Sequence, residues 1–306
     1  MINNIIPVAI VINNDYAMQA SVVIASLISS KDTDTFYHVN IVTDSINKHN
    51  SDKLLSMQTN NVKIDIVQLG AKYESIINDT RWSNIIFYKF NVPFIFNEYE
   101  KIILLDADTI VLKDLTEMYN TELNDNYAAV VNDITMILKD DKFTKSITHY
   151  FNIGTILFNA KKIRKDFSLE DVITCYMNNT DLFLSPEQDT LNYLFENKLV
   201  FLHPKYQYIT LYDNYLKSNL LKFHKIKNKK ELDINNLVIL HFAQMQPWKY
   251  FNLPYGKIWD KYYKQSPFYK PLKRQFYSLF NNIYRKIRYN FCYLKHKKEV
   301  LNYHDN

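Results

Sequence analysis

The sequence contains few glycines and few cysteines, and each shortage excludes a class of site. Only 3 of the 306 residues are glycine, and Gly70, Gly154 and Gly256 lie far apart. Phosphate loops of the Gly-x-Gly-x-x-Gly or Walker type need clustered glycines, so a bound nucleotide must be held by another device. The two cysteines, Cys175 and Cys292, form neither a disulfide framework nor a metal-knuckle spacing.

The chain also lacks long apolar runs and a secretory signal. No uninterrupted apolar segment approaches the roughly 20 residues that a membrane-spanning helix needs. The N-terminal residues, Met1 to Ile5, lack the basic residues that begin a secretory signal. Because scarce cysteine also suits a reducing compartment, these features predict a cytoplasmic protein.

Positive charge is concentrated at the C-terminal end. The whole chain carries a net charge of +5, but residues 270–306 alone hold nine Lys or Arg residues against two acidic ones. The rest of the chain is therefore slightly acidic, which argues against a core that binds nucleic acid.

This basic tail is also aromatic, and its apolar residues recur at helical spacing. They are Phe276, Phe280, Ile283, Tyr284, Ile287, Phe291 and Leu294. Such a stripe either packs against its own domain or lies in an anionic membrane surface, and the flanking basic residues modestly favour the membrane. We therefore expect a main domain at residues 1–265 and a tail at residues 266–306 that associates peripherally with the inner face of the cytoplasmic membrane.

Strands and helices alternate along the domain, which predicts an α/β fold with a mainly parallel sheet and helices on both faces. The expected strands are residues 5–12, 36–43, 62–69, 102–105, 126–131 and 154–159. The expected helices are residues 18–30, 48–58, 84–96 and 161–177, with Pro93 breaking the third.

Two aspartates follow a short aliphatic run. The run, Ile102 to Leu105, is too short for a helix and indicates a strand buried on both faces. Residues i and i+2 of a strand point to the same side, so Asp106 and Asp108 converge if the extended geometry persists. Their mutual repulsion would be relieved by Mg²⁺ or Mn²⁺. The alternative is a pair of solvated aspartates in a turn.

Five motifs carry a family resemblance. They are Asn13 to Ala17, Leu104 to Asp108, Phe151 to Asn159, Glu187 to Asn192, and His241-Phe242 with Pro247-Trp248. Their types, order and approximate spacing resemble the family 8 glycosyltransferases, particularly bacterial enzymes of lipooligosaccharide and capsule assembly. The resemblance implies a GT-A fold and a retaining transfer of galactose or glucose from a UDP-sugar to a hydroxyl of a cell-surface saccharide or glycolipid acceptor.

The resemblance also implies a metal site. Asp106, Asp108 and His241 would hold Mn²⁺ (or Mg²⁺) against the UDP diphosphate, with Ala107 beside the nucleotide, and an imidazole ligand favours Mn²⁺. His241 follows the aliphatic run Leu237 to Leu240, so its alternative role is a hydrogen-bonded core histidine at a strand end.

The nucleotide segment is expected after the first strand. Asn13, Asn14, Asp15 and Tyr16 match the residues that hold uridine, with Tyr16 as the stacking candidate. Asn13 departs from the family, which usually has an acid there. The alternative is a strand-to-helix turn whose polar residues cap the helix.

Lysines are the candidates for diphosphate contacts. Lys89 stands where the family usually has an arginine, so it would offer a point charge to the diphosphate or sugar instead of a bidentate fork. Its alternative is a solvated helix face. The segment from His241 to Trp248 is one residue shorter than the family pattern and lacks the lysine before proline, and Lys249 is the candidate substitute.

Four residues match positions around the donor sugar. The resemblance places Gln188 beside the anomeric carbon and Asp189 on the sugar hydroxyls, with Asn152 and Glu187 nearby. Glutamine is a poor nucleophile, so retention by same-face attack is more consistent with the sequence than a covalent intermediate. The alternative for Glu187 is an acidic residue in the first turn of a helix.

Two other functions remain open. The run Asp106 to Thr109 also fits the opening motif of haloacid-dehalogenase-like phosphatases, but three strands precede it, and Asp140-Asp141 follows too soon to be the second acid pair. The shortened C-terminal motif leaves open a glycosyltransferase-like fold that binds without turnover. The candidate acceptor segments are residues 133–150 and 206–215.

Overall fold

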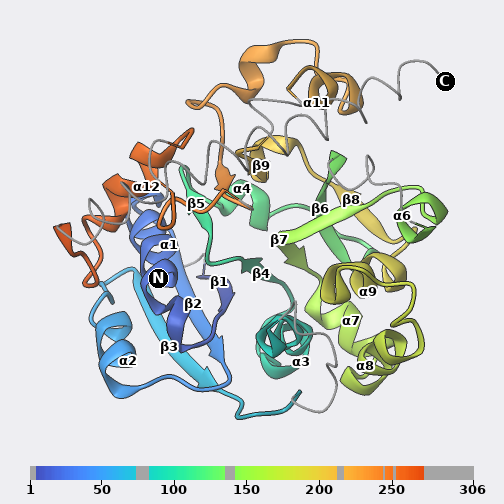
Figure 1. Cartoon of the computed structure of the whole chain (residues 1–306), viewed down its shortest axis with the longest axis horizontal. Coiled ribbons are helices and arrows are strands. Elements are labelled where there is room, and N and C mark those ends of the chain that lie inside the picture. Colours follow the sequence, from blue (N-terminus) through green and yellow to red (C-terminus); the bar gives the residue numbers. More distant parts are fainter. Residues whose placement is uncertain are drawn as a thin grey trace.

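The structure, a computed structural model, describes residues 5–73, 83–134, 142–211, 217–243, 245–250 and 253–271. A seven-stranded sheet contains β1 (Ile5–Val11), β2 (Phe36–Thr43), β3 (Val62–Gln68), β4 (Ile102–Leu105), β6 (Ala128–Asn132), β7 (Phe151–Phe158) and β8 (Leu199–Phe201). Its strand order is β3-β2-β1-β4-β7-β6-β8 (Figure 1). β7 runs antiparallel to β4 and β6, and the other adjacent pairs are parallel. The expected α/β fold with a mainly parallel sheet is therefore confirmed.

A second, three-stranded sheet lies beyond β4. It consists of β5 (Thr109–Val111), β9 (Tyr208–Ile209) and β10 (Ile239–His241). β10 pairs antiparallel with β5 and parallel with β9. Because β5 follows β4 after a short turn, the two sheets meet at the carboxyl end of β4.

Helices cover both faces of the central sheet. The α-helices are α1 (Ala17–Ser30), α2 (Lys48–Leu55), α3 (Val92–Ile95), α4 (Thr116–Tyr119), α6 (Lys142–Ser146), α7 (Ala160–Asp166), α8 (Leu169–Asn178), α9 (Pro186–Leu194), α11 (Lys217–Phe223) and α12 (Gly256–Tyr263). The 3₁₀ helices are η1 (Asn14–Tyr16), η2 (Asn84–Asn91), η3 (Pro204–Tyr206) and η4 (Lys229–Leu232).

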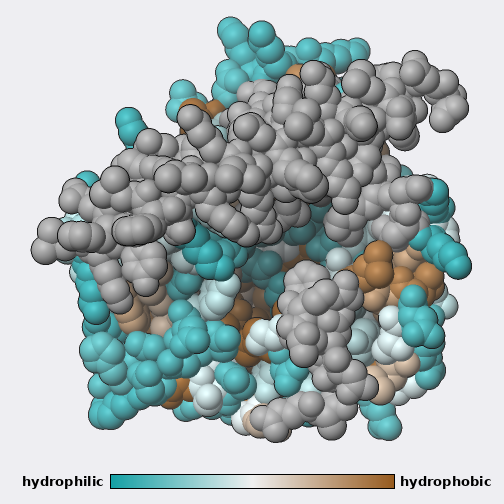
Figure 2. Space-filling model, viewed as in Figure 1, coloured by the Kyte–Doolittle hydropathy of each residue, from teal (hydrophilic) through white to brown (hydrophobic). Residues whose placement is uncertain are grey.

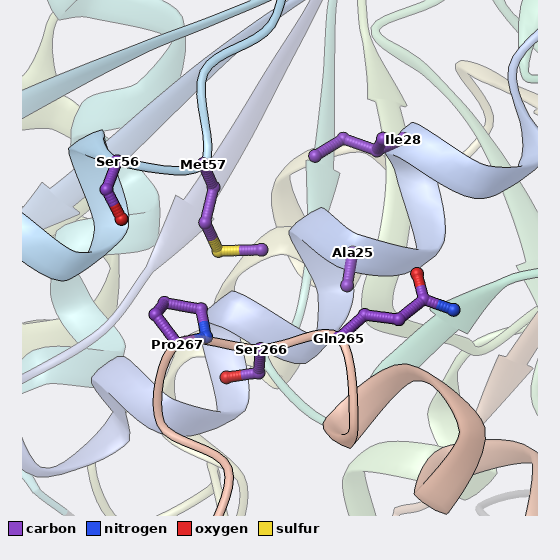
Figure 3. A pocket seen from close by; sticks show the side chains of 7 residues that line it. All are labelled: Ala25, Ile28, Ser56, Met57, Gln265, Ser266 and Pro267. Carbon is purple, nitrogen blue, oxygen red and sulfur yellow. The ribbon is translucent and has the colours of Figure 1, made fainter.

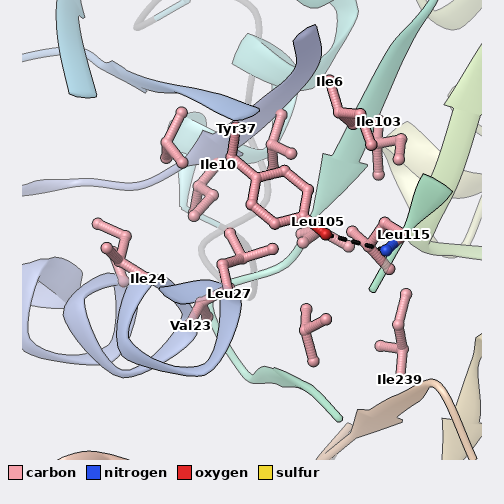
Figure 4. Close-up of a cluster of buried hydrophobic side chains, with 14 of the residues drawn as sticks. Ile6, Ile10, Val23, Ile24, Leu27, Tyr37, Ile103, Leu105, Leu115 and Ile239 are labelled. Carbon is pink, nitrogen blue, oxygen red and sulfur yellow. Dashed lines mark hydrogen bonds between the residues drawn. The ribbon is translucent and has the colours of Figure 1, made fainter. Parts of the chain in front are cut away.

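The strand that precedes the aspartates is buried on both faces, as expected. Ile103 and Leu105 belong to the hydrophobic cluster that contains α1, whereas Leu104 belongs to the cluster that contains α3, α7, α8 and α9. Figure 4 shows the α1 side, where Val23 and Leu27 approach the strands. Such two-sided burial explains why this run is aliphatic without alternation.

The prediction of one α-helix at residues 84–96 is wrong, because most of this segment is a 3₁₀ helix. Residues 84–91 form the 3₁₀ helix η2, and a single α-helical turn, α3, follows. Pro93 lies in the first turn of α3, where its missing N–H costs no hydrogen bond, so it begins a helix instead of breaking one.

The predicted helix at residues 161–177 is two helices, α7 and α8. Ser168 separates them because its hydroxyl accepts a hydrogen bond from Asp171 N–H, while the Asp171 carboxylate accepts one from Ser168 N–H. This reciprocal capping box starts a new helix inside a continuous apolar pattern.

The last described residues, which are α12 and the beginning of the tail, pack against α1. α12 packs against α1, and the Oγ atoms of Ser21 and Ser266 lie 2.6 Å apart. A groove of about 310 Å³ runs between α1, the end of α2 and the segment Gln265 to Pro267 (Figure 3). The expected amphipathic helix at residues 276–294 lies outside the described residues, so that prediction stays untested. Within the described ranges, no helix has the length and apolar character to cross a membrane.

Candidate active site

β4 and β5 are joined by a tight turn that carries Asp106, Ala107 and Asp108. Thr109 donates its N–H to Asp106 O at 3.1 Å and its hydroxyl to the same oxygen at 2.8 Å. The extended geometry does not persist here, because the Thr109 hydrogen bonds close the chain into a turn, but the two carboxylates still converge. Asp106 N–H donates to Gly154 O at 2.9 Å, which anchors the turn to β7.

The second sheet brings His241 to this turn. His241 lies opposite Thr109 in the β10–β5 pairing, and Phe242 N–H donates to Asp108 O at 2.9 Å. His241 Nε2 lies 3.0 Å from Asp108 Oδ1 and 4.0 Å from Asp106 Oδ2. The structure therefore gathers the three predicted metal residues from two separate segments.

The donor set fits a divalent cation. Asp106, Asp108 and His241 each offer one ligand atom, and these atoms lie within 4.8 Å of one another. Two carboxylates and an imidazole are ligands that suit Mn²⁺. Burial lowers the pKa of His241, but the Asp108 and Asp106 carboxylates outweigh it, so this pKa is raised. Burial raises the pKa of Asp108, but the opposing effects of His241 and Lys89 are larger, so this pKa is lowered overall.

Gly154 makes room for the imidazole. A Cβ atom at this position would lie 2.2 Å from His241 Cε1, closer than any real contact. The first residues of β7 thus form one wall of the candidate site, since Thr155 pairs with Leu105 at the end of β4.

Lys89 is buried beside the metal residues. Its Nζ lies 2.7 Å from Asp106 Oδ1 and 3.8 Å from Glu187 Oε1, and the residue is 8% exposed. The solvated-face alternative for Lys89 is therefore wrong. Burial lowers its pKa, but the Asp106 and Glu187 charges more than compensate, so the pKa is raised and the ammonium stays charged.

Glu187 points at the same cluster from the first turn of α9. Burial is the main reason that its pKa is raised, with the Lys89 charge opposing the shift. Its Oε2 is buried and has no hydrogen-bond partner within the described ranges. A buried carboxylate oxygen without a donor is costly, which makes this atom a candidate ligand contact.

Gln188 and Asp189 are held in a buried hydrogen-bond network. Gln188 Nε2 donates to Tyr150 OH at 2.9 Å, and Ile153 N–H donates to Gln188 Oε1 at 3.4 Å. Tyr150 OH donates to Asp189 Oδ1, and Ser185 N–H donates to Asp189 Oδ2 at 2.8 Å. Burial, with Asp189 nearby, raises the pKa of Tyr150, which keeps it a neutral donor.

Tyr150 was not among the predicted site residues. In the sequence it directly precedes the motif that begins at Phe151, and it was included only as the end of the candidate acceptor segment 133–150. Gln207 was likewise included only as part of the candidate acceptor segment 206–215. Its Nε2 donates to Asn152 Oδ1 at 2.5 Å, and Asn152 Oδ1 accepts a second hydrogen bond from Gly154 N–H at 2.9 Å.

The nucleotide segment follows β1 at the same edge of the sheet. Asn13 and Tyr16 make no side-chain hydrogen bond that caps η1 or α1, so the helix-capping alternative is wrong there. Asn14 Oδ1 instead accepts from Asn47 N–H and Asn50 Nδ2, both at 3.0 Å, at the start of α2. Asp15 is exposed.

Tyr16 connects the N-terminal and C-terminal motifs. Its ring lies edge-on to Trp248 with the ring centroids 6.2 Å apart, and its hydroxyl hydrogen-bonds the Gln246 side chain. Burial and the charge of Asp108 raise the pKa of Tyr16. Lys249 follows Trp248 in a turn, where its N–H donates to Gln246 O at 3.1 Å. Its role at the diphosphate stays a prediction.

Comparisons with known proteins identify the family of this chain. A family model described as "Glycosyl transferase family 8" matches residues 7–252. A lipopolysaccharide 1,2-glucosyltransferase of Escherichia coli K12 is 24% identical over 242 residues, covering 74% of this chain and 68% of that protein. General stress protein A of Bacillus subtilis is 23% identical over 248 residues, covering 77% and 85%.

Solved structures share the fold. The galactosyltransferase LgtC, in complex with donor and acceptor sugar analogues, superposes with a TM-score of 0.72 at 16% identity over 88% of this chain and 99% of that one. The WbbM bifunctional glycosyltransferase gives a TM-score of 0.72 at 19% identity over 90% of this chain. The match spans about half of WbbM, 52% of its chain.

Proposed function

This chain belongs to glycosyltransferase family 8, and from that membership we propose that it transfers galactose or glucose from a UDP-sugar to a hydroxyl of a saccharide or glycolipid acceptor. The observation that carries the proposal is the Asp106, Asp108 and His241 cluster, with Lys89 and Glu187 beside it. It lies at the carboxyl end of β4, where open α/β sheets bind ligands.

Asp106, Asp108 and His241 would hold one divalent cation, Mn²⁺ or Mg²⁺. When bound, the cation neutralises the negative charge that develops on the departing UDP. Lys89 supports the same task because its buried ammonium supplies a fixed positive charge beside Asp106. We assign Lys249 to the outer side of the diphosphate.

The nucleoside would lie against the N-terminal segment. Tyr16 is held by Trp248 and Gln246, so its ring is pre-positioned for stacking on uracil. Asn13 Oδ1 is buried and has no partner within the described ranges, and we assign it to the uracil imide N–H. Asn14 is engaged with α2 and would shape the segment without direct contact.

The donor sugar would lie beside the first turn of α9. Glu187 Oε2 is the unpaired acceptor for a sugar hydroxyl. Asn152 lies at the start of β7, beside Ile153, whose N–H donates to Gln188 Oε1 of α9. Gln188 and Asp189 are engaged with Tyr150, which supports a positioning role and argues against attack by either side chain on the anomeric carbon.

The transfer we propose retains the anomeric configuration. The acceptor oxygen forms the new bond to the anomeric carbon on the face from which the phosphate oxygen departs. The acceptor proton passes to that departing oxygen, so no protein base is consumed. A β-linked product from an α-linked donor, identified by NMR, would contradict this route.

UDP release from a panel of UDP-sugars tests the proposal. We expect one donor to be hydrolysed slowly with Mn²⁺. This release of UDP should be abolished by EDTA or by Asp108→Ala. Donor binding without release in the presence of saccharide acceptors would favour the binding-only alternative. Release that is indifferent to EDTA would contradict the metal-dependent reaction.

Two expectations about partners remain proposals. The acceptor would contact residues 133–150 and 206–215, which are only partly within the described ranges. The basic tail would hold the protein peripherally at an anionic membrane, the cytoplasmic face being the expected location.

A further inference from the structure

Gln207 lies behind the candidate metal site, where it contacts His241 and the neighbouring Asn152. The residue is 1% exposed and directly precedes β9. Its Nε2 donates to Asn152 Oδ1 at 2.5 Å and lies 3.3 Å from His241 Nδ1. Its Oε1 is buried and has no hydrogen-bond partner within the described ranges. A buried amide oxygen without a donor is unfavourable, so a nearby group is expected to satisfy it in another state.

The neighbouring backbone fixes the orientation of the amides. Gly154 N–H can only donate, so the Asn152 atom that it meets at 2.9 Å must be Oδ1. The Gln207 atom that meets Asn152 Oδ1 must then be the donor Nε2. His241 turns Nε2 to Asp108, at 3.0 Å, and therefore presents Nδ1 to Gln207.

A cation at His241 Nε2 changes what Gln207 must offer. A ring nitrogen that binds a cation uses its lone pair, so the remaining proton of the neutral ring lies on Nδ1 and needs an acceptor. The Gln207 NH₂ group cannot accept it, whereas Oε1 can. A half-turn of the Gln207 amide brings Oε1 to Nδ1–H and satisfies the unpaired oxygen.

We propose that Gln207 is the positioning residue for His241, and that it couples cation binding at His241 to the release of Asn152. The inference rests on the proposed function, because it assumes a cation at the Asp106, Asp108 and His241 cluster. After the half-turn, Nε2 no longer faces Asn152 Oδ1, and the Oε1 atom that replaces it has no proton to donate. Asn152 then gains an acceptor atom for the donor sugar only when the metal site is filled.

Two substitutions at Gln207 separate this role from a packing role. Gln207→Met keeps the length but removes the acceptor, and Gln207→Glu keeps an acceptor for Nδ1–H. Both remove the NH₂ group that binds Asn152. Calorimetric titration of the full chain with Mn²⁺ should show about 10- to 100-fold weaker binding for Q207M, and Q207E should bind at least as tightly as the original protein.

Thr210→Val is the matched control. Thr210 is 2% exposed, and its Oγ1 is also buried without a partner within the described ranges. T210V should bind Mn²⁺ like the original protein. Equal weakening of Q207M and Q207E, or unchanged binding by Q207M, would overturn the inference. Absence of Mn²⁺ binding by the original protein would instead contradict the proposed function.

A spectroscopic readout tests the hydrogen bond in the original chain, where Gln207 is unchanged and the extra charge of Q207E is absent. In ¹⁵N-histidine-labelled protein loaded with diamagnetic Mg²⁺, His241 should carry its proton on Nδ1 and exchange it slowly with water. The signal is identified by its loss in His241→Gln. A rapidly exchanging Nδ1 proton, or a proton on Nε2 in the Mg²⁺-loaded protein, would contradict a hydrogen bond to Gln207.

Discussion

Gly154 gives the His241 imidazole the space that it occupies beside Asp106 and Asp108. The backbone of Gly154 also accepts from Asp106 N–H, so one residue bounds both parts of the metal cluster. The backbone of Gly154 is not in the left-handed region, so its conformation does not require glycine. A glycine is needed because a side chain would collide with the His241 ring.

Gly154→Ala should therefore displace the imidazole. The added Cβ would lie 2.2 Å from His241 Cε1, so the ring must move away from Asp108. We expect Mn²⁺ affinity, measured by calorimetry, to fall by about 10-fold or more. Gly256→Ala is the control, because its Cβ would meet no atom closer than Leu253 Cβ at 3.7 Å. Equal Mn²⁺ binding by both variants would show that the ring has another way to fit.

The buried carboxylate of Glu187 should lower the stability of the folded protein at neutral pH. Its folded-state pKa is raised mainly by burial, so ionisation costs stability as pH rises from its ordinary pKa through the raised one. In metal-free protein, Glu187→Gln should therefore be more stable at neutral pH, and the gain should vanish below the ordinary glutamate pKa. Thermal unfolding across this pH range provides the measurement.

The same variant should lose donor recognition. Removing a charged acceptor for a sugar hydroxyl should cost about 1.5–3 kcal/mol in transition-state stabilisation, measured as kcat/KM for the UDP-sugar. Glu196→Gln, in the turn that follows the C-terminal end of α9, is the control. Unchanged donor kinetics in E187Q would place the sugar elsewhere.

At the scale of elements, the packing of β2 against the segment after β5 supports the sheet that carries the site. The Tyr37 hydroxyl accepts from Leu115 N–H at 2.9 Å (Figure 4). The same hydroxyl donates to Asp114 Oδ2 at 3.3 Å. Both Tyr37 and Leu115 are fully buried. This contact ties two segments far apart in sequence.

Tyr37→Phe should lower stability without changing the chemistry. It leaves Leu115 N–H buried without an acceptor, which costs about 1–3 kcal/mol, seen as a lower denaturant midpoint. Tyr193→Phe is the control because Tyr193 is 48% exposed. The prediction is contradicted if Y37F and Y193F unfold at the same denaturant concentration. It is also contradicted if folded Y37F, but not Y193F, loses Mn²⁺ binding.

The elements that the sequence predicts well are those decided by local pattern. Strand 36–43 matches β2 fully, because its buried apolar residues Tyr37, Val39 and Ile41 recur at every second position, which is the spacing of one face of a strand. The helix at 161–177 was predicted as one because its apolar periodicity continues past Ser168, where the capping box divides it. Around Asp106, the Thr109 hydroxyl competes for the backbone and turns the chain, which strand periodicity does not indicate.

The site residues also fall into those that belong to a sequence motif and those that depend on long-range contacts. Asp106, Asp108 and His241 could be predicted because each belongs to a motif with its own pattern. Gln207 could not, because its role depends on contact with Asn152, 55 residues away. Tyr150 likewise acts through Asp189, 39 residues away, and only the packed fold brings them together.

At the scale of the whole molecule, charge is separated between a slightly acidic body and a basic tail. The described surface in Figure 2 is largely hydrophilic. Residues 270–306 carry nine Lys or Arg residues against two acids. Each basic residue near an anionic bilayer contributes about 1 kcal/mol, so a chain with this tail should bind such membranes reversibly.

Deleting residues 272–306 should abolish binding to vesicles that contain anionic lipid, measured by sedimentation at low and high salt. The full chain should bind these vesicles in a salt-sensitive way and ignore neutral ones. A matched variant, Arg285→Gln with Lys286→Gln and Arg288→Gln, should lose most of the binding while keeping the apolar stripe. If the shortened protein still binds anionic vesicles, the tail is not the part that binds the membrane.

The central claim is that Asp106, Asp108 and His241 hold one cation against the donor diphosphate. Anomalous diffraction at the manganese edge, from crystals grown with UDP and Mn²⁺, tests it most directly. We expect one anomalous peak within coordination distance of the two carboxylates and His241 Nε2, in contact with the UDP phosphates. UDP bound at this edge of the sheet without a peak there, or with manganese on other residues, would contradict the claim.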